Sequence, residues 1–183
     1  MRRAVRSLRA FSGDRRGVSA VEFALVAPIL VVLIMGVAEL GRYGIFRMKV
    51  HDAVGNLADL VARLNEAEAT QIDALMATVP IILDPFDDPE RFLIVVSAVE
   101  QRAQPVVAWQ RTLGNLSSEN SRIGQPGAAA RMPQGLVSTE MPTVIAAEVM
   151  VRYDSWLHNY VVDHTAYDTA FSRPRRTTLA DIR

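Results

Sequence analysis

Cysteine is absent from this chain of 183 residues. Its absence excludes disulfide bonds, zinc sites built on thiolates and catalysis by a cysteine nucleophile. An envelope protein that folds without oxidation would have such a composition. The length predicts one domain with appended segments. Half of the residues are hydrophobic, which is enough for a modest core even after a membrane segment is subtracted.

The chain also lacks the short motifs of the common enzyme classes. It contains no glycine-rich phosphate loop, no HExxH, no GxSxG and no dinucleotide fingerprint. We therefore expect no enzymatic activity and no cofactor. A membrane-tethered hydrolase or metal enzyme is the least favoured of the functions considered.

Two groups of side chains have the chemistry of metal ligands. A zinc site would draw on Asp154, His158, Asp163 and His164. A calcium site would draw on Asp84, Asp87, Asp88 and Glu90. The first group needs three or four converging ligands with supporting hydrogen bonds, and the second lacks the glycine of an EF-hand turn. Prolines among acids more simply form turns, so we predict no metal site.

Formal charge is balanced over the whole chain but not along it. The first 17 residues hold six of the 20 basic residues and one of the 20 acidic ones, so the remainder carries 14 against 19, a net charge of −5. The remainder is mildly acidic and has no basic stripe. This pattern argues against nucleic acid as a partner.

An uncharged apolar run follows this basic leader. Val18 to Ala38 is 21 residues long, about 30 Å as a helix, which matches a bilayer core. A cleaved secretory signal is the alternative, but such signals have apolar regions of about 7–15 residues. The leader arginines favour a cytoplasmic N-terminus. The sequence thus predicts a single-pass anchor with residues beyond Glu39 outside the cytoplasm.

A carboxylate interrupts the start of this run, in the segment Gly17-Val18-Ser19-Ala20-Val21-Glu22-Phe23. A charged side chain at mid-bilayer costs about 2.5–3.5 kcal/mol on insertion scales and less near the edge, so Glu22 is a candidate functional residue. The segment resembles the class III signal of type IV prepilins. That resemblance implies cleavage of the Gly17–Val18 bond by a prepilin peptidase, with Glu22 and Phe23 as mature residues five and six.

The helix is expected to continue beyond the membrane to about Glu66. Apolar residues recur with spacings of three and four, which is typical of one face of an amphipathic helix: Tyr43, Phe46, Val50, Val54, Leu57, Val61 and Leu64. Periodicity does not say whether this face packs on the chain's own domain or on neighbouring subunits, so both remain open. Pro28 lacks an N–H and predicts a kink inside the membrane.

The remaining residues, 67–183, predict an α+β domain. A short helix is expected at Ala69 to Val79, ended by Pro80, and strands are expected at Phe92–Val99, Pro105–Arg111, Thr143–Tyr153 and about Ala166–Ser172. In the third strand one face carries Ile145, Ala147, Val149, Val151 and Tyr153. The segment 114–142 is rich in Gly, Pro, Ser, Ala and Gln and reads as a long surface loop outside the core.

The chain as a whole resembles a TadE-like minor pseudopilin of the tight-adherence (Tad, or Flp-type) pilus. The residues that carry the resemblance are Arg15-Arg16-Gly17, Ala20 to Pro28, Glu39-Leu40-Gly41-Arg42, the strand Glu148–Tyr153 and the terminal Phe171–Arg175. It implies removal of residues 1–17, an anchor in the bacterial inner membrane and a periplasmic domain. The implied partners are prepilin peptidase, other pilins or pseudopilins, the inner-membrane assembly platform and membrane lipid. The alternative is an uncleaved single-pass interaction module of the cell envelope.

Overall fold

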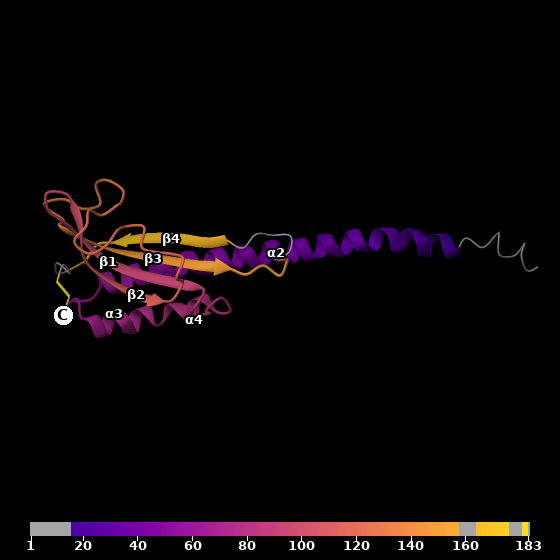
Figure 1. Cartoon of the computed structure of the whole chain (residues 1–183), viewed down its shortest axis with the longest axis horizontal. Coiled ribbons are helices and arrows are strands. Elements are labelled where there is room, and N and C mark those ends of the chain that lie inside the picture. The colour runs from indigo at the N-terminus through magenta and orange to yellow at the C-terminus, as the bar shows by residue number, and fades with distance from the viewer. Residues whose placement is uncertain (1–15, 158–163, 176–180, 183) are drawn as a thin grey trace, which may run out of the picture. The chain divides into compact units, whose positions relative to one another are not determined.

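The computed structural model describes residues 16–157, 164–175 and 181–182 (Figure 1). The chain forms two compact units, with the boundary between Arg42 and Tyr43. One element, the helix α2 (Arg16–Ala62, 47 residues), contributes to both units. The expected helix is therefore present, although it ends four residues before Glu66.

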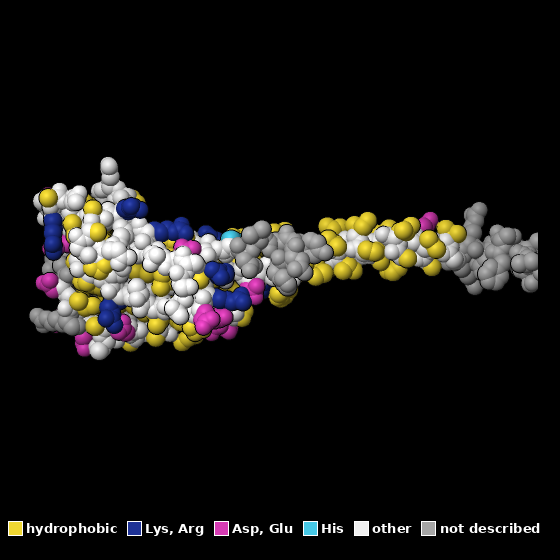
Figure 2. Space-filling view, in the orientation of Figure 1, with side chains coloured by type: hydrophobic (Ala, Val, Ile, Leu, Met, Phe, Trp, Pro, Cys, Tyr) yellow, Lys and Arg dark blue, Asp and Glu magenta, His cyan; other side chains and the backbone are white. Residues whose placement is uncertain are grey.

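The first part of α2 has the composition of a membrane span. Among the described residues, α2 is the helix long and apolar enough to cross a bilayer, and the most apolar stretch of it is uncovered by other parts of the chain. Figure 2 shows hydrophobic side chains on the visible surface of this stretch. Apolar side chains left in water are unfavourable by about 25 cal/mol per Å². The composition and exposure of this stretch therefore favour lipid as its surroundings.

The second unit contains a four-stranded antiparallel sheet in the order β2-β1-β3-β4. Its strands are β1 (Phe92–Gln101), β2 (Pro105–Gly114), β3 (Thr143–Tyr153) and β4 (His164–Ser172). All four expected strands are present, with β1, β2 and β4 longer than predicted. The two central strands are buried along most of their length, whereas the edge strands β2 and β4 are partly exposed.

One face of the sheet packs against the second half of α2. Phe46, Val50, Val54, Leu57 and Val61 are buried in the main core, and Tyr43 and Leu64 pack at its margin. The apolar stripe of the helix therefore packs on the chain's own domain. This is one of the two arrangements that the sequence left open, the other being packing on neighbouring subunits. The same core receives the predicted face of β3, Ile145 to Tyr153 at alternate positions.

Two short helices complete this side: α3 (Ala69–Met76) and α4 (Val79–Leu83). The structure differs here from the expectation of one helix ended by Pro80. Proline fits the first turn of a helix, where its missing N–H has no intrahelical acceptor, and Pro80 lies at that position in α4. Arg111 of β2 forms an ion pair with Asp73 of α3, which ties this layer to the edge of the sheet.

The segment between β2 and β3 covers the opposite face of the sheet. Its Ile123 and Val137 form a second core with Val99, Val107 and Val144, and its Leu116 is also buried. The expectation that this segment lies outside the core is therefore wrong. The domain has three layers: helices, sheet and an ordered loop layer.

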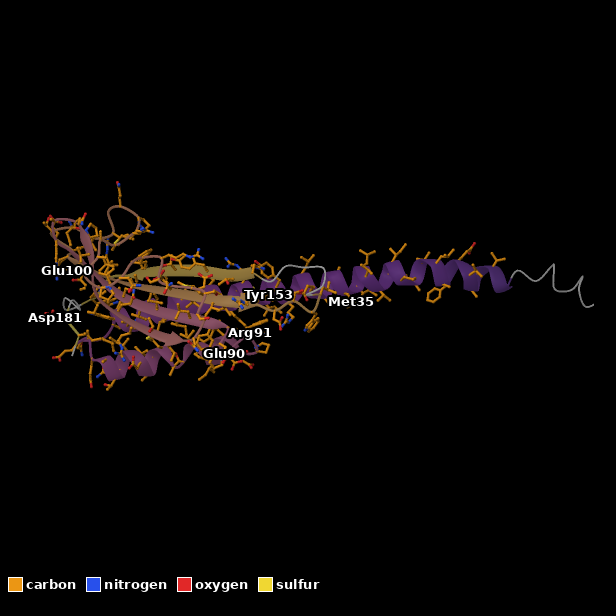
Figure 3. All side chains as sticks on the ribbon, in the orientation of Figure 1. Met35, Glu90, Arg91, Glu100, Tyr153 and Asp181 are labelled. Atoms are coloured by element: carbon orange, nitrogen blue, oxygen red, sulfur yellow. The ribbon has the colours of Figure 1, made fainter. Side chains whose placement is uncertain are left out.

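The end of the domain at which the chain enters is packed with aromatic rings. The ring of Tyr43 lies 5.2 Å from that of Tyr153, and Phe46 lies 4.9 Å from both Tyr153 and Phe86. Figure 3 shows Tyr153 at this end of the sheet and Glu100 at the other. Rings at these separations pack favourably, so this cluster holds the C-terminal end of β3 and the 84–91 loop against the entering helix.

Candidate functional site

The five residues singled out by sequence lie on one element, the first part of α2. Gly17, Val18, Glu22, Phe23 and Pro28 all fall within Arg16–Ala62. The side chains of Val18, Glu22 and Phe23 are exposed, Phe23 to 67%. The structure thus presents a continuous apolar helix surface with one carboxylate near its start.

The Gly17–Val18 bond lies in the first turn of α2. The first N–H groups of a helix have no intrahelical acceptors, and helix ends fray. This first turn also carries no acidic residue to interact favourably with the positive end of the helix dipole. Local unfolding of the helix around the Gly17–Val18 bond therefore breaks few hydrogen bonds. A Cβ added at Gly17 would meet nothing within 4 Å, so the fold itself does not require glycine there.

A second polar centre, not found from the sequence, is buried in the middle of the sheet. Glu148 of β3 is fully buried, at 0% exposure. Its carboxylate accepts four hydrogen bonds: from the Ser121 hydroxyl, from the backbone N–H groups of Arg122 (2.8 Å) and Ile123 (3.3 Å), and from the Tyr167 hydroxyl (3.1 Å). A buried carboxylate is tolerated only when hydrogen bonds replace its hydration.

The partners of Glu148 come from two different elements. Residues 121–123 belong to the loop layer, and Tyr167 lies on β4. Burial raises the pKa of Tyr167 to about 12, and the charge of Glu148 adds to the effect. The guanidinium of Arg122 lies 4.2 Å from the centre of the Tyr167 ring, a cation–π distance. Glu148 therefore fastens the loop layer to the sheet.

The residues that form this centre do not recur at the spacing of a helix or a strand, so periodicity does not reveal them. On β3, Glu148 shares its face with Val144, Ala146 and Met150, which are apolar. A carboxylate flanked on its own face by apolar residues on a central strand indicates burial with partners. The partners themselves lie in a loop without periodicity, so their identity required the structure.

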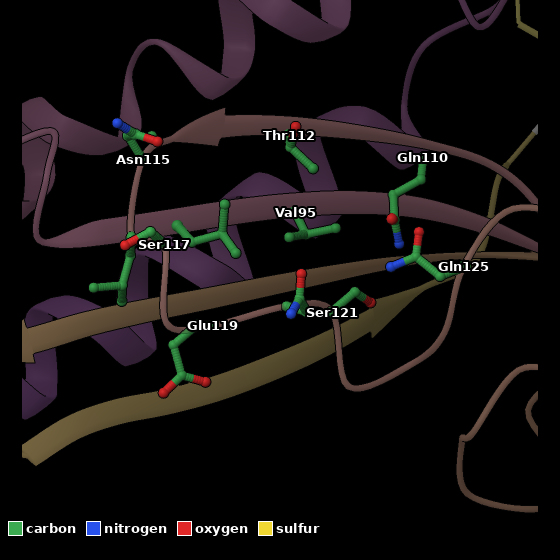
Figure 4. A pocket seen from close by; sticks show the side chains of 12 residues that line it. Val95, Gln110, Thr112, Asn115, Ser117, Glu119, Ser121 and Gln125 are labelled. Atoms are coloured by element: carbon green, nitrogen blue, oxygen red, sulfur yellow. The ribbon is translucent and has the colours of Figure 1, made fainter.

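A shallow pocket of about 330 Å³ lies beside this centre, between β1, β2 and the loop (Figure 4). Its lining is mostly polar and includes Gln110, Thr112, Asn115 and Gln125. The side-chain amide of Gln110 already donates to Ser97 (2.9 Å) and to the carbonyl of Gly124 (3.0 Å). The pocket thus results from the packing of the loop against β1 and β2, and we assign it no ligand.

The metal candidates do not converge in the described part of the chain. No group of three or more His, Asp or Glu residues there is placed to hold an ion, the 84–90 acids included. Asp154 pairs with Arg91 (2.9 Å), and His164 lies 3.1 Å from the Tyr43 hydroxyl. His158 and Asp163 lie outside the described residues.

The described residues define the class: one helix long and apolar enough to span a membrane, followed by an α+β domain. A family model described as TadE-like protein matches residues 17–59. The match confirms the TadE-like resemblance over the part of α2 that carries Gly17 and Glu22. No curated protein and no solved structure matches the chain.

Proposed function

We propose that the protein is a minor pseudopilin of a bacterial Tad (Flp-type IV) pilus. In this proposal a prepilin peptidase removes residues 1–17, and Val18 becomes the mature N-terminus. The apolar part of α2 anchors the protein in the inner membrane until it packs with other pilins or pseudopilins on the assembly platform. The domain from Tyr43 onward is periplasmic.

One observation carries the proposal. The TadE-like match begins at Gly17, and from there α2 is an exposed apolar helix with a carboxylate in its second turn. The second half of the same helix is already covered by the sheet. The surface left for subunit packing is therefore the N-terminal part, where pilin-like assembly would place it. Glu22, Phe23 and Pro28 are its proposed recognition and bending residues.

Processing is the first test. Cleavage after Gly17 removes 17 of 183 residues, so the membrane form should have the mass of 166 residues beginning at Val18. Gly17→Leu should abolish cleavage, because a peptidase that holds the backbone closely at this bond has no room for a side chain. Intact-mass measurement of membrane protein from cells that express the peptidase provides the readout.

The control for this test is Gly36→Leu. Cβ atoms at Gly17 and Gly36 both meet open space, so the fold accepts both changes and only the first should alter processing. A mature protein that begins at Met1 would support the uncleaved interaction module instead. One that begins near Glu39 would indicate a secretory signal, and either result would exclude the pseudopilin.

Membrane orientation is the second test. Six leader arginines should hold the N-terminus in the cytoplasm, so a reporter active only in the periplasm should be active when fused after Arg183. A reporter active only in the cytoplasm should be silent at the same position. The opposite pair of results would contradict the proposed anchor.

A further inference from the structure

The two edge strands of the sheet differ in how their outer edges are covered. The outer edge of β2 pairs with the loop layer, where the N–H of Val107 donates to Ala128 (3.0 Å) and the N–H of Gly127 donates to Val107 (2.8 Å). β2 also begins with Pro105, which has no N–H to offer. Among the described residues, the backbone of β4 pairs with β3 alone (Figure 1). β4 is therefore the open edge of the sheet.

Two hydrogen bonds show which backbone groups β4 presents at this edge. The N–H of Thr169 donates to Oδ1 of the preceding Asp168 (2.9 Å) and not to β3. The N–H of Arg152, which lies opposite Thr165, donates to Arg91 on the β1 side of β3 (2.8 Å). Because backbone groups alternate in direction along a strand, those that point outward belong to Thr165, Tyr167, Thr169 and Phe171. An incoming strand can pair with these groups, and it replaces the bond from Thr169 to Asp168.

The sequence of β4 lacks the usual protection of an edge strand. Exposed edges are commonly blocked by proline, by lysine or by a bulge. β4 contains no proline and no lysine, and its nine residues pair with β3 without a shift of register. An open edge of this length is suited to the addition of a strand from another chain.

Three arginines lie along this edge, on the face that carries the loop layer. Arg152 is opposite Thr165 near the start of β4, Arg122 lies 4.2 Å from the ring centre of Tyr167, and Arg173 directly follows the strand. Figure 2 shows Lys and Arg side chains along β4. From Thr165 to Arg173 this arginine row extends about 27 Å. The row therefore runs the length of the open edge.

The arginine row has few acidic partners among the described residues. The guanidinium of Arg152 donates to the hydroxyl of Ser118 (3.1 Å), and that of Arg173 donates to a backbone carbonyl of the loop layer (3.5 Å). Both acceptors are neutral. Arg122 lies 3.6 Å from Glu119. The row therefore carries excess positive charge beside unpaired backbone groups.

We propose that β4 binds an extended acidic segment of a partner protein, which adds to the sheet as a fifth strand. Every second side chain of such a strand lies on the loop-layer face, next to the arginine row. The segment therefore carries Asp or Glu at alternate positions. On the opposite face Asp168 forms an ion pair with His51 (2.9 Å), so the intervening side chains are uncharged. The proposal concerns the domain alone and does not rest on the assignment to a pilus.

The same arginines disfavour a second copy of the chain as the occupant. Two antiparallel β4 strands joined edge to edge by a two-fold axis keep their loop-layer faces on the same side of the joined sheet. The two arginine rows then lie next to each other, and like charges on neighbouring strands are destabilising. An acidic strand has the opposite charge and avoids this cost.

Peptides of the length of β4, nine residues, test the proposal with the full chain in detergent micelles. The probe alternates glutamate with threonine or valine, and a block peptide of the same composition has its glutamates consecutive. A third peptide has the probe sequence with methylated backbone nitrogens, which cannot donate to the edge. By fluorescence anisotropy the probe should bind at least about tenfold more tightly than the block peptide, and the methylated peptide should not bind.

Variants of the chain locate the contact. Arg152→Glu and Arg173→Glu should each weaken binding of the probe by about tenfold or more. Arg102→Glu makes the same change at an exposed arginine of the β1–β2 hairpin and should leave binding unchanged. Thr165→Pro removes an outward N–H while leaving the bonds to β3, and should weaken binding as well. If this variant fails to fold, the methylated peptide tests the same hydrogen bonds.

Three results would overturn the proposal. Equal binding of the probe and the block peptide, or binding of the methylated peptide, would show a contact through charge without an added strand. Failure of the probe to bind would exclude an acidic strand at this edge. Dimerisation of the full chain that Thr165→Pro abolishes would identify a second copy as the occupant.

Discussion

Replacing Glu148 by alanine should lower the free energy of unfolding of the domain by about 3–5 kcal/mol, the usual cost of breaking a buried charged network. The carboxylate accepts four hydrogen bonds, from Ser121, Arg122, Ile123 and Tyr167. Alanine removes the acceptor and leaves these donors unpaired; a donor that stays buried, such as the N–H of Ile123, costs about 1–3 kcal/mol unless water enters. Since domains are stable by about 5–15 kcal/mol, the loss is a large fraction of the total.

The loop layer should be the first part to respond. Three of the four donors belong to residues 121–123, so without Glu148 this layer loses its polar attachment to β3 while keeping its apolar contacts through Ile123 and Val137. Urea denaturation of the full chain in detergent micelles measures the free energy. Limited proteolysis should cut the variant within 115–142 before it cuts elsewhere.

Two further variants separate the buried network from the general effect of removing a glutamate. Glu148→Gln retains the shape and one acceptor oxygen, and should lose about 1–2 kcal/mol because it gives up charge-assisted bonds. Glu140→Ala, in the exposed part of the same loop layer, should remain within about 0.5 kcal/mol of wild type. If Glu148→Ala also stayed within that range, the hydrogen bonds would not hold the layer.

The elements that can be predicted from the sequence are those in which apolar residues recur at regular spacing. The stripe that begins at Tyr43 recurs at three and four residues, and its members from Phe46 to Val61 form the face that α2 buries. The alternation from Ile145 to Tyr153 gives the face that β3 turns to the helices. In both cases one packing partner covers one face of the element. The residues on that face are therefore apolar and recur in the sequence at the period of the helix or strand.

The elements that the sequence does not reveal depend on contacts between segments distant along the chain. The loop layer has only a few buried apolar side chains, Leu116, Ile123 and Val137 among them, at irregular intervals, so it has no period to detect. Glu148 lies on a strand that is covered on both faces, and its hydrogen-bond partners at residues 121–123 and at Tyr167 are distant from it along the chain. Pro80 suggests the end of a helix, but proline is equally suited to the first turn of the next one.

Replacing Glu22 by glutamine should leave membrane insertion and cleavage largely intact and reduce incorporation into the pilus machinery by about tenfold or more. Cleavage at Gly17 would create an ammonium group on Val18, which is largely protonated near neutral pH. Each charge alone is unfavourable beside hydrocarbon, whereas a pair offsets much of the desolvation. Since tenfold in an equilibrium corresponds to about 1.4 kcal/mol, a modest loss in this pairing suffices.

The partner of Glu22 can lie on its own helix or on a neighbouring one. Four residues separate Val18 from Glu22, a rise of about 6 Å, so a contact within the first turn is within reach of the side chain. The structure leaves the Glu22 side chain exposed among apolar residues, and this exposure makes it available to a neighbouring subunit shifted along the helix axis. Pilin-like assembly implies the neighbouring subunit.

Crosslinking distinguishes these arrangements and tests the role of the charge. A photo-reactive group placed next to Val18 should capture another pilus subunit in the wild type and fail to do so in Glu22→Gln, while intact mass shows that both proteins are processed. Glu140→Gln makes the same chemical change at an exposed position of the domain and should crosslink and support pili as the wild type does. Equal crosslinking and normal piliation by Glu22→Gln would mean that the carboxylate is not an assembly contact. Glutamine preserves the size of the side chain and removes only its charge. Loss of crosslinking together with loss of cleavage would therefore mean that the peptidase recognises this charge.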